Sequence, residues 1–292
     1  EGGWLWKISG NGLSHPSYLF GTYHGTYDIL YQYTDSIPEL HQAFNACSQF
    51  AGESETTSKP TPAQVGAAIK LPKDTTYADL LNKEDFHFLD SIVRQSLKSP
   101  LNKMYIKPNF LALILGEIEK GKKLVDTGYS QSRIDSMKSQ VMDIALEKKA
   151  KEKGLTIVGL EDIFDAFVSE KSNLKKEADE LISDLREDDE ISPLSFVNTL
   201  SDVYRTQNMK SLIDFEVKVD SIFRTSPKLT EIGKRIREDL LKRRNLNWMN
   251  KIPELMKAQP TFIAVGVRHL PGKDGLIALL LEKGYQVEPI GL

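Results

Sequence analysis

Cysteine is almost absent from this chain: one thiol, Cys47, occurs among 292 residues. A single thiol excludes an internal disulfide, and it also excludes a metal site built from several thiolates. Any metal bound by the protein must therefore use histidine and carboxylate ligands. Because Cys47 lies close to the apolar residues Ala46 and Phe50, we expect it to be a small core residue and not a nucleophile.

Long hydrophobic runs are missing too, since none approaches the roughly 20 residues that a membrane-spanning helix needs. Neither sign of charge dominates, because the net charge is only −3 at pH 7. Such a balance gives no reason to expect nucleic acid or an anionic membrane as a partner. The chain is 40% hydrophobic and 27% charged, which is typical of a folded protein with a sizeable core.

Familiar catalytic and nucleotide-binding motifs are also absent. The chain has neither Gly-x-Ser-x-Gly nor His-Glu-x-x-His, which argues against the common serine-hydrolase and zincin schemes. Residues 116–123 nearly match a phosphate-binding loop, but they lack its final Ser or Thr and their middle is typical of a helix. Gly10-Asn11-Gly12 lacks the third glycine of a dinucleotide fingerprint and predicts a hairpin turn instead.

The N-terminus lacks methionine and begins Glu1-Gly2-Gly3 directly before Trp4. This start favours an extracytoplasmic protein (periplasmic, secreted or lipid-anchored) whose leader or anchor has been removed. A cytoplasmic protein with a trimmed N-terminus is the alternative. The sequence leaves the oligomeric state open.

One short pattern occurs twice, near opposite ends of the chain: Gly-x-x-His, at Gly21-Thr22-Tyr23-His24 and at Gly266-Val267-Arg268-His269. Each copy follows a short apolar run that is typical of a buried strand. A glycine at a strand end lets the backbone turn sharply, and the histidine then lies on the loop that leaves the strand. Ligands of open α/β sheets bind at such strand ends. The alternative is that each histidine is a hydrogen-bonded structural residue.

Apolar patterns predict the remaining elements. Short apolar runs predict strands at 4–8, 17–22, 47–52, 155–160, 261–265 and 285–289. Helical spacing or composition predicts helices at 38–46, 109–115, 141–151, 174–185, 235–249 and 275–283. We expect the helix at 109–115 to be buried because its apolar residues are continuous.

These elements predict an α/β fold in a single domain. Its mixed β-sheet core is formed by the N- and C-terminal segments, and it carries a large helical insertion. We expect the sheet core at residues 1–58, 154–165 and 258–292, and mainly helical structure at 60–152 and 170–250.

Histidines and glutamates gather at the predicted strand exits: His24, Glu53, Glu161 and His269. Two neutral imidazoles and one carboxylate form a recurring ligand set for Zn²⁺, Mn²⁺ or Co²⁺ that leaves positions open for water. Such an ion can bring the pKa of its bound water to about 7. Side chains two residues apart lie on the same side of an extended segment, so we expect Glu55 to be on the same side as Glu53 and able to reach the site. The alternative is a polar strand end in water.

Several segments together carry a likeness to a known family: 5–8, 18–24, 53–55, 142–143, 159–161, 244–245, 262–275 and 284–285. On these segments the chain resembles the TraB/GumN family, which is related to the Tiki metalloproteases that act on Wnt proteins. The resemblance implies metal-dependent hydrolysis, with His24, His269 and Glu53 as its functional core. It also implies a fold similar to the erythromycin-esterase-like fold, in which His and Glu residues surround a cleft.

The chain departs from the family's pattern at three positions. Gly52 precedes Glu53 where a bulky apolar residue is usual, and Ala166 lies near where a glutamine is often found. Arg268 stands where a small residue is common, so we expect it to crowd His269 or to add a positive charge beside it.

The leading hypothesis is a metal-dependent, peptidase-like hydrolase that acts on a peptide or small-molecule substrate. His24, Glu53 and His269 hold Mn²⁺, Co²⁺ or Zn²⁺ in this hypothesis. Glu55 or Glu161 moves protons, and Arg244 steadies a developing oxyanion. The alternative is a non-catalytic extracytoplasmic protein that binds a peptide or signal on the same fold.

Two residues of the predicted helix at 235–249, Arg244 and Asn245, have structural roles as alternatives to a role in the site. Arg244 can face solvent or pair with acidic segments instead of stabilising an oxyanion. Asn245 can orient a ligand or cap the backbone of its own helix.

Overall fold

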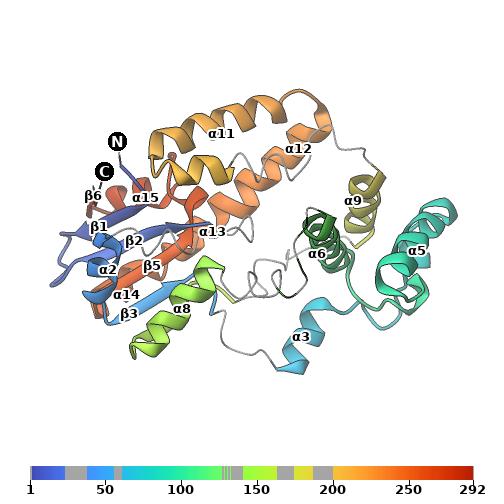
Figure 1. Cartoon of the computed structure of the whole chain (residues 1–292), viewed down its shortest axis with the longest axis horizontal. Coiled ribbons are helices and arrows are strands. Elements are labelled where there is room, and N and C mark those ends of the chain that lie inside the picture. Colours follow the sequence, from blue (N-terminus) through green and yellow to red (C-terminus); the bar gives the residue numbers. More distant parts are fainter. Residues whose placement is uncertain are drawn as a thin grey trace. The chain divides into compact units, whose positions relative to one another are not determined.

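The computed structural model describes residues 2–23, 38–55, 61–126, 141–162, 174–186 and 200–291, together with residues 128, 130 and 132. The chain divides into two compact units, whose elements are labelled in Figure 1. The first unit comprises residues 1–58, 136–163 and 191–292, and the second comprises 59–135 and 164–190. In the part of the chain described, no helix is long and apolar enough to cross a membrane.

The first unit contains a mixed sheet, as predicted. Its strands are β1 (Leu5–Ser9), β2 (Ser17–Thr22), β3 (Gln49–Gly52), β4 (Thr156–Gly159), β5 (Thr261–Gly266) and β6 (Gln286–Pro289). They lie in the order β4-β3-β5-β2-β1-β6. Neighbouring pairs among β4, β3, β5 and β2 are parallel, whereas β1 is antiparallel to both β2 and β6. The α/β fold with strands from both ends of the chain is therefore confirmed.

A tight hairpin joins β1 to β2, as the Gly10-Asn11-Gly12 sequence predicted. All three residues have positive φ angles, of 75°, 46° and 79°. Glycine and asparagine tolerate this left-handed backbone better than other residues do. The hairpin pairs Leu5 with Phe20. The other edge of β2 pairs with the parallel strand β5.

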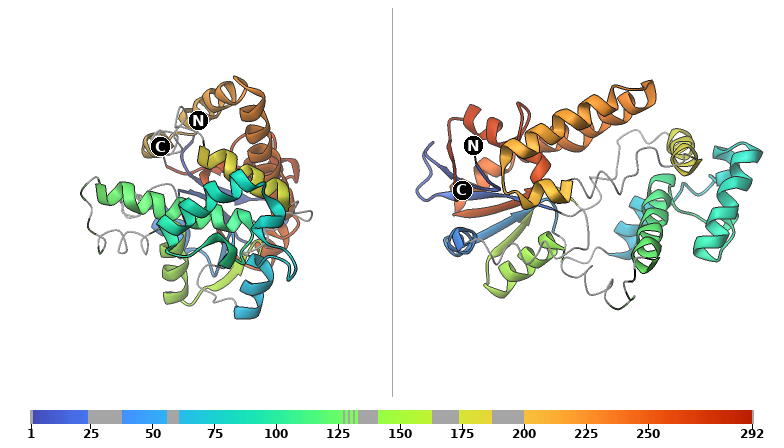
Figure 2. Two further views of the ribbon diagram at one scale, coloured as in Figure 1. Left: turned by 90° about the vertical axis from the view of Figure 1, so that its right-hand side faces the viewer. Right: turned by 45° about the horizontal axis from the view of Figure 1, so that its top comes forward.

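Helices of the first unit cover both faces of the sheet: α2 (Pro38–Asn45), α8 (Met142–Glu152), α11 (Met209–Phe223), α14 (Ile252–Ala258) and α15 (Leu276–Glu282). Figure 2 shows α11 and α8 on opposite sides of the sheet. The core between these layers is aromatic at its centre, where Phe50 stacks on Phe262 with ring centroids 6.2 Å apart. Burial of such side chains is the main stabilising contribution to this unit.

The second unit is helical in the residues described and has its own apolar core. Its elements are α3 (Pro62–Ile69), α4 (Tyr77–Leu80), α5 (Lys83–Leu97), η1 (Leu101–Lys103), α6 (Pro108–Asp126) and α9 (Leu174–Arg186). The predicted helix at 109–115 is confirmed as part of α6, but the expectation that it is buried was wrong. Leu111 and Leu115 are buried, whereas Leu113 and Ile114 are 45% and 39% exposed, because only one face of α6 joins this core.

The carboxyl ends of four parallel strands meet at one edge of the sheet. The register pairs Gly52 of β3 with Gly159 of β4 and with Ala264 of β5, and it pairs Thr22 of β2 with Gly266. The residues that follow these strands therefore lie side by side, although they come from distant parts of the sequence.

Candidate functional site

Backbone pairing continues beyond β3 and β4 and brings two glutamates together. The Leu160 N–H donates to the Gly52 carbonyl at 2.9 Å, and the Glu161 N–H donates to the Glu53 carbonyl at 2.8 Å. Consequently Glu53 and Glu161 occupy equivalent positions on neighbouring chain segments. Both side chains are mostly buried, at 18% and 11% exposure.

The glycines of the two Gly-x-x-His copies do not have a left-handed backbone. Neither Gly21 nor Gly266 has a positive φ, although the chain passes directly from β5 into a short helix after Gly266. A Cβ on Gly21 would lie 2.8 Å from Val267 Cγ2 and 3.1 Å from Val267 Cα. Gly21 is therefore needed for the close approach of η3 (Val267–His269) to β2.

Arg244 reaches the site from one long helical segment. This segment runs through α12 (Pro227–Arg235), a π-helical stretch η2 (Ile236–Lys242) and α13 (Arg243–Trp248). The single helix predicted at 235–249 therefore contains a stretch with π-type hydrogen bonding, a rare geometry that is frequent at functional sites. The Arg244 side chain is only 15% exposed, so it faces the sheet edge and not solvent.

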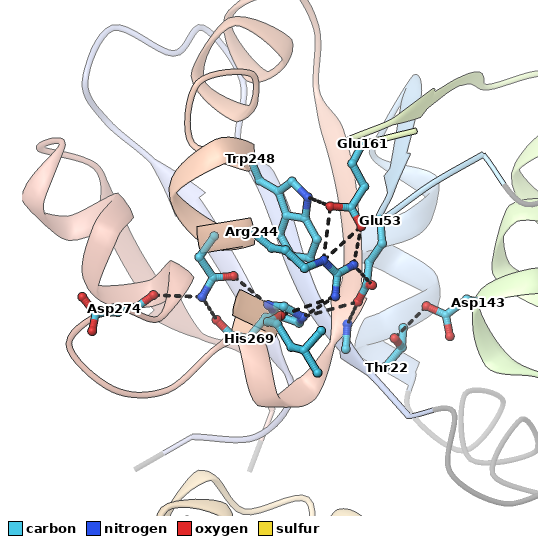
Figure 3. Close-up of polar contacts among 11 residues, drawn as sticks. Thr22, Glu53, Asp143, Glu161, Arg244, Trp248, His269 and Asp274 are labelled. Carbon is cyan, nitrogen blue, oxygen red and sulfur yellow. Dashed lines mark hydrogen bonds and ion pairs between the residues drawn. The ribbon is translucent and has the colours of Figure 1, made fainter. Parts of the chain in front are cut away.

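The Arg244 guanidinium lies between the two glutamates (Figure 3). Its Nε lies 3.0 and 3.2 Å from the two carboxylate oxygens of Glu161, and its Nη2 donates to both Glu161 and Glu53. The guanidinium carbon also lies 4.7 Å from the centroid of the Trp248 ring, within the range of a cation–π contact. Trp248 Nε1 in turn donates to Glu161 Oε2 at 3.1 Å.

Arg244 is a cation that contacts both carboxylates of this cluster. Burial lowers the pKa of the Arg244 guanidinium, but hydrogen bonds and charges from Glu161 and Glu53 outweigh this effect and raise it above its ordinary value. The guanidinium is therefore permanently charged. The two carboxylates therefore share this guanidinium.

Glu53 links the charged cluster to the second histidine. Its Oε1 accepts a hydrogen bond from the Gly266 N–H at 2.6 Å, while its Oε2 faces Arg244. The same Oε1 lies 3.9 Å from His269 Nε2. The backbone amide at the end of β5 thus fixes the glutamate carboxylate beside the imidazole.

His269 is buried and surrounded by polar and aromatic groups. Its Nε2 lies 3.3 Å from Arg244 Nη1, and its Nδ1 lies 2.7 Å from Asn245 Oδ1. The Trp248 ring packs against the imidazole with centroids 4.5 Å apart. Each of the two ring nitrogens therefore has a defined neighbour.

The structure brings together four of the six predicted site residues: Glu53, Glu161, Arg244 and His269. Glu55 instead lies 3.7 Å from Lys151 Nζ on α8 and is 41% exposed. Its predicted orientation was wrong, because the chain bends after Gly52 and the period of two no longer applies. His24 and Ala166 lie outside the described residues.

Arg268 does not crowd the histidine, contrary to expectation. Its guanidinium faces α11 and makes two contacts with the Glu216 carboxylate, at 2.6 and 2.9 Å. This paired geometry is typical of arginine and carboxylate groups. The Glu216 carboxylate therefore neutralises the positive charge of Arg268, and this ion pair points away from the His269 imidazole.

Trp248 and a polar pair at the end of β2 belong to the site but are not marked by any of the sequence motifs. Trp248 follows Arg244 by four residues, so both lie on one face of a helix, and this spacing was the available signal. Thr22 Oγ1 donates to Asp143 Oδ1 at 2.8 Å (Figure 3). Nearby, the buried Tyr204 hydroxyl donates to the Gly21 carbonyl at 2.7 Å, which anchors the same strand end.

The donor chemistry fits a divalent ion in part. Glu53 offers a carboxylate and His269 an imidazole nitrogen, and both are common ligands of Zn²⁺ and Mn²⁺. Among the described residues, no group of three or more His, Cys, Asp or Glu side chains could hold a metal ion. A complete ligand set therefore needs a further donor, for which His24 remains the prediction.

The fold and the site define an α/β protein with a glutamate–arginine–histidine cluster at the carboxyl edge of a mixed sheet. A family model for the TraB/PrgY/gumN family matches residues 4–289, nearly the whole length. The chain belongs to the TraB/PrgY/gumN family, and the predicted resemblance is confirmed. No curated protein and no solved structure matches it.

Proposed function

We propose that this protein is a metal-dependent hydrolase that acts on peptides. The observation that supports the proposal best is the pair formed by Glu53 Oε1 and His269 Nε2, 3.9 Å apart. Both groups lie at the carboxyl edge of parallel strands, where α/β proteins bind ligands.

In this proposal Glu53 and His269 are two of the metal ligands, and His24 is the third. A bound Mn²⁺, Co²⁺ or Zn²⁺ supplies Lewis acidity and lowers the pKa of a bound water molecule. The remaining roles belong to side chains around the ligands. Since Arg244 contacts Glu53 and lies 3.3 Å from the His269 Nε2, it holds both ligands in place.

Arg244 and Glu161 act as a pair in this proposal. Both oxygens of Glu161 accept hydrogen bonds from Arg244, and one also accepts from Trp248. We therefore assign Glu161 to positioning the guanidinium. Arg244 supplies the positive charge that a developing oxyanion requires, because its donors are already held in place by folded structure. Glu55, which lies 3.7 Å from Lys151 Nζ, takes no part in this positioning.

Metal binding by isothermal titration calorimetry, followed by a peptide-library assay read by mass spectrometry, tests the proposal. Protein purified without an affinity tag should bind Mn²⁺, Co²⁺ or Zn²⁺ and cleave peptides. Glu53→Gln should lose both properties, because the amide removes the charge that a divalent ion prefers. The matched change Glu55→Gln, beside Lys151, should retain metal binding. Full binding and turnover by Glu53→Gln would exclude Glu53 as a ligand.

A non-catalytic binding protein is the second candidate, and one observation favours it. The Arg244 guanidinium already partners both site carboxylates, so the cluster is stable without another cation. In that case a peptide or signal ligand would bind to the wild type in the presence of a chelator. Absence of metal binding and of peptide cleavage by the wild type would decide for this candidate.

A further inference from the structure

The amide of Asn245 is buried, faces the His269 imidazole and can adopt only one orientation. Its Nδ2 donates to the Asp274 carbonyl at 2.8 Å and to the His269 carbonyl at 3.3 Å. Backbone carbonyls only accept hydrogen bonds, so the amide nitrogen must face them. The Asn245 oxygen must then face His269 Nδ1, which lies 2.7 Å away.

This orientation determines the hydrogen on the imidazole. Because Asn245 Oδ1 only accepts, His269 Nδ1 must carry the hydrogen. The contact on the other side of the ring is compatible with this tautomer. Arg244 Nη1, 3.3 Å from Nε2, belongs to a guanidinium that only donates, so it favours an acceptor at Nε2.

Packing prevents the ring from escaping these contacts. His269 is 4% exposed, and Trp248 lies against it at 4.5 Å between centroids. The bond to Asn245 is shorter than the one to Arg244, at 2.7 against 3.3 Å. Hydrogen bonds weaken with distance, so Asn245 contributes more than Arg244 to the choice of tautomer.

We propose that Asn245 is a positioning residue that fixes the neutral His269 imidazole as its Nδ1–H tautomer and keeps the Nε2 lone pair toward Glu53. Its functional consequence rests on the proposed function, because this lone pair is the one that would bind the metal. Partners of this kind commonly orient metal-binding histidines and affect metal affinity 10- to 100-fold. The tautomer itself depends on no metal.

Long-range proton–nitrogen NMR spectra of metal-free protein with ¹⁵N-labelled histidine test the tautomer directly. The chain has five histidines, and the signals lost in His269→Gln identify the relevant ring. At a pH where this ring is neutral, the wild type should show only the Nδ1–H form. Asn245→Ala should show a detectable Nε2–H population, whereas Arg244→Met should keep the Nδ1–H form. An Nε2–H wild type, or an unchanged tautomer in Asn245→Ala, would overturn the inference.

Two further variants separate positioning from stability. Asn208→Ala removes the hydrogen bonds that cap α11 at Lys210 and Ser211, so it weakens the fold without touching His269, and its tautomer should match the wild type. Should Asn245→Ala not fold, Asn245→Ser replaces it. Serine lacks the amide oxygen that faces Nδ1 in the wild type.

Calorimetry with Mn²⁺ alone provides the functional measurement. Asn245→Ala should bind Mn²⁺ 10- to 100-fold more weakly than the wild type, whereas Asn208→Ala should bind with unchanged affinity. Equal affinity in Asn245→Ala and wild type would overturn the positioning role. If the wild type binds no divalent ion, the proposed function fails, but the NMR spectra still decide the tautomer.

Discussion

At the scale of single residues, the Arg244 cation between two carboxylates should have a large effect on stability. Arg244, Glu53 and Glu161 retain only 11–18% of their side-chain exposure. Removing one partner from such a group leaves a charge that has lost both water and counterion. Removing charges of both signs together leaves a smaller imbalance.

Arg244→Met should therefore destabilise the metal-free protein by about 3 kcal/mol. The double change Arg244→Met with Glu161→Gln should cost less than the sum of the two single changes, because it removes one charge of each sign. Urea unfolding of the four proteins in chelator measures this difference. Strictly additive losses would show that the two side chains do not stabilise one another.

Cys47 illustrates how burial controls reactivity. Its side chain is buried, and burial raises the pKa of the thiol to about 12. Since the thiolate is the reactive form, native protein at pH 8 should react with a thiol reagent only very slowly. Protein unfolded in guanidinium should react at once with one equivalent. Rapid stoichiometric reaction of the native form would contradict the assignment of Cys47 to the core.

The same shift has a consequence for stability. The folded thiol has a raised pKa, so its contribution is fully present below the ordinary value of 9.0 and is lost as the pH rises toward about 12. Between pH 9 and 10 the wild type should lose about 1 kcal/mol more than Cys47→Ala does. Urea unfolding at both pH values measures the difference. Equal losses would show that the folded thiol ionises normally.

At the scale of elements, the close approach of η3 to β2 depends on Gly21. The Val267 side chain and backbone lie within 3.1 Å of the place that a Cβ at this position would occupy, so the added methyl group must displace the turn that carries His269. Gly21→Ala should therefore destabilise the protein by about 1–3 kcal/mol and change the His269 signals in the NMR spectra of histidine-labelled protein.

A glycine elsewhere provides the matched control for this prediction. Gly116 lies in α6 with open space around it, so Gly116→Ala should raise stability by up to about 1 kcal/mol through helix propensity alone. Thermal melting compares the two variants. Unchanged His269 signals and melting in Gly21→Ala would show that η3 does not require the close approach.

At the scale of the whole molecule, the proposed metal site brings together residues that are far apart in the sequence. Glu53 follows β3, whereas His269 lies beyond β5 near the C-terminus. An ion that binds only the folded state stabilises it by about 2.7 kcal/mol at a hundredfold excess over its dissociation constant. Mn²⁺ or Co²⁺ should therefore raise the melting temperature of the wild type.

His269→Ala should abolish this rise, and His15→Ala should preserve it. His15 is exposed at the β1–β2 hairpin and thus controls for the loss of a histidine. Differential scanning fluorimetry with and without chelator gives the comparison. An equal rise in His269→Ala and wild type would indicate that the ions bind elsewhere.

Local patterns in the sequence identified the strands to within two residues, but they did not individually identify helices such as α5 and α11. Apolar runs bounded by turn residues identified the strands, and the Gly-Asn-Gly segment identified the hairpin, because burial and φ preferences act on neighbouring residues. Strand exits in turn pointed to Glu53, Glu161 and His269. That inference was possible because the carboxyl ends of parallel strands share one edge of a sheet.

Tertiary structure alone decided which side chains contact one another. It turned Arg244 toward both glutamates, Arg268 toward Glu216 and Glu55 toward Lys151. No local pattern distinguishes these partners, because charged side chains are long and each choice depends on the register of distant segments. Which face of α6 is buried and how the Asn245 amide is oriented depend on contacts with segments that are distant in the sequence. Periodicity within one segment does not contain this information.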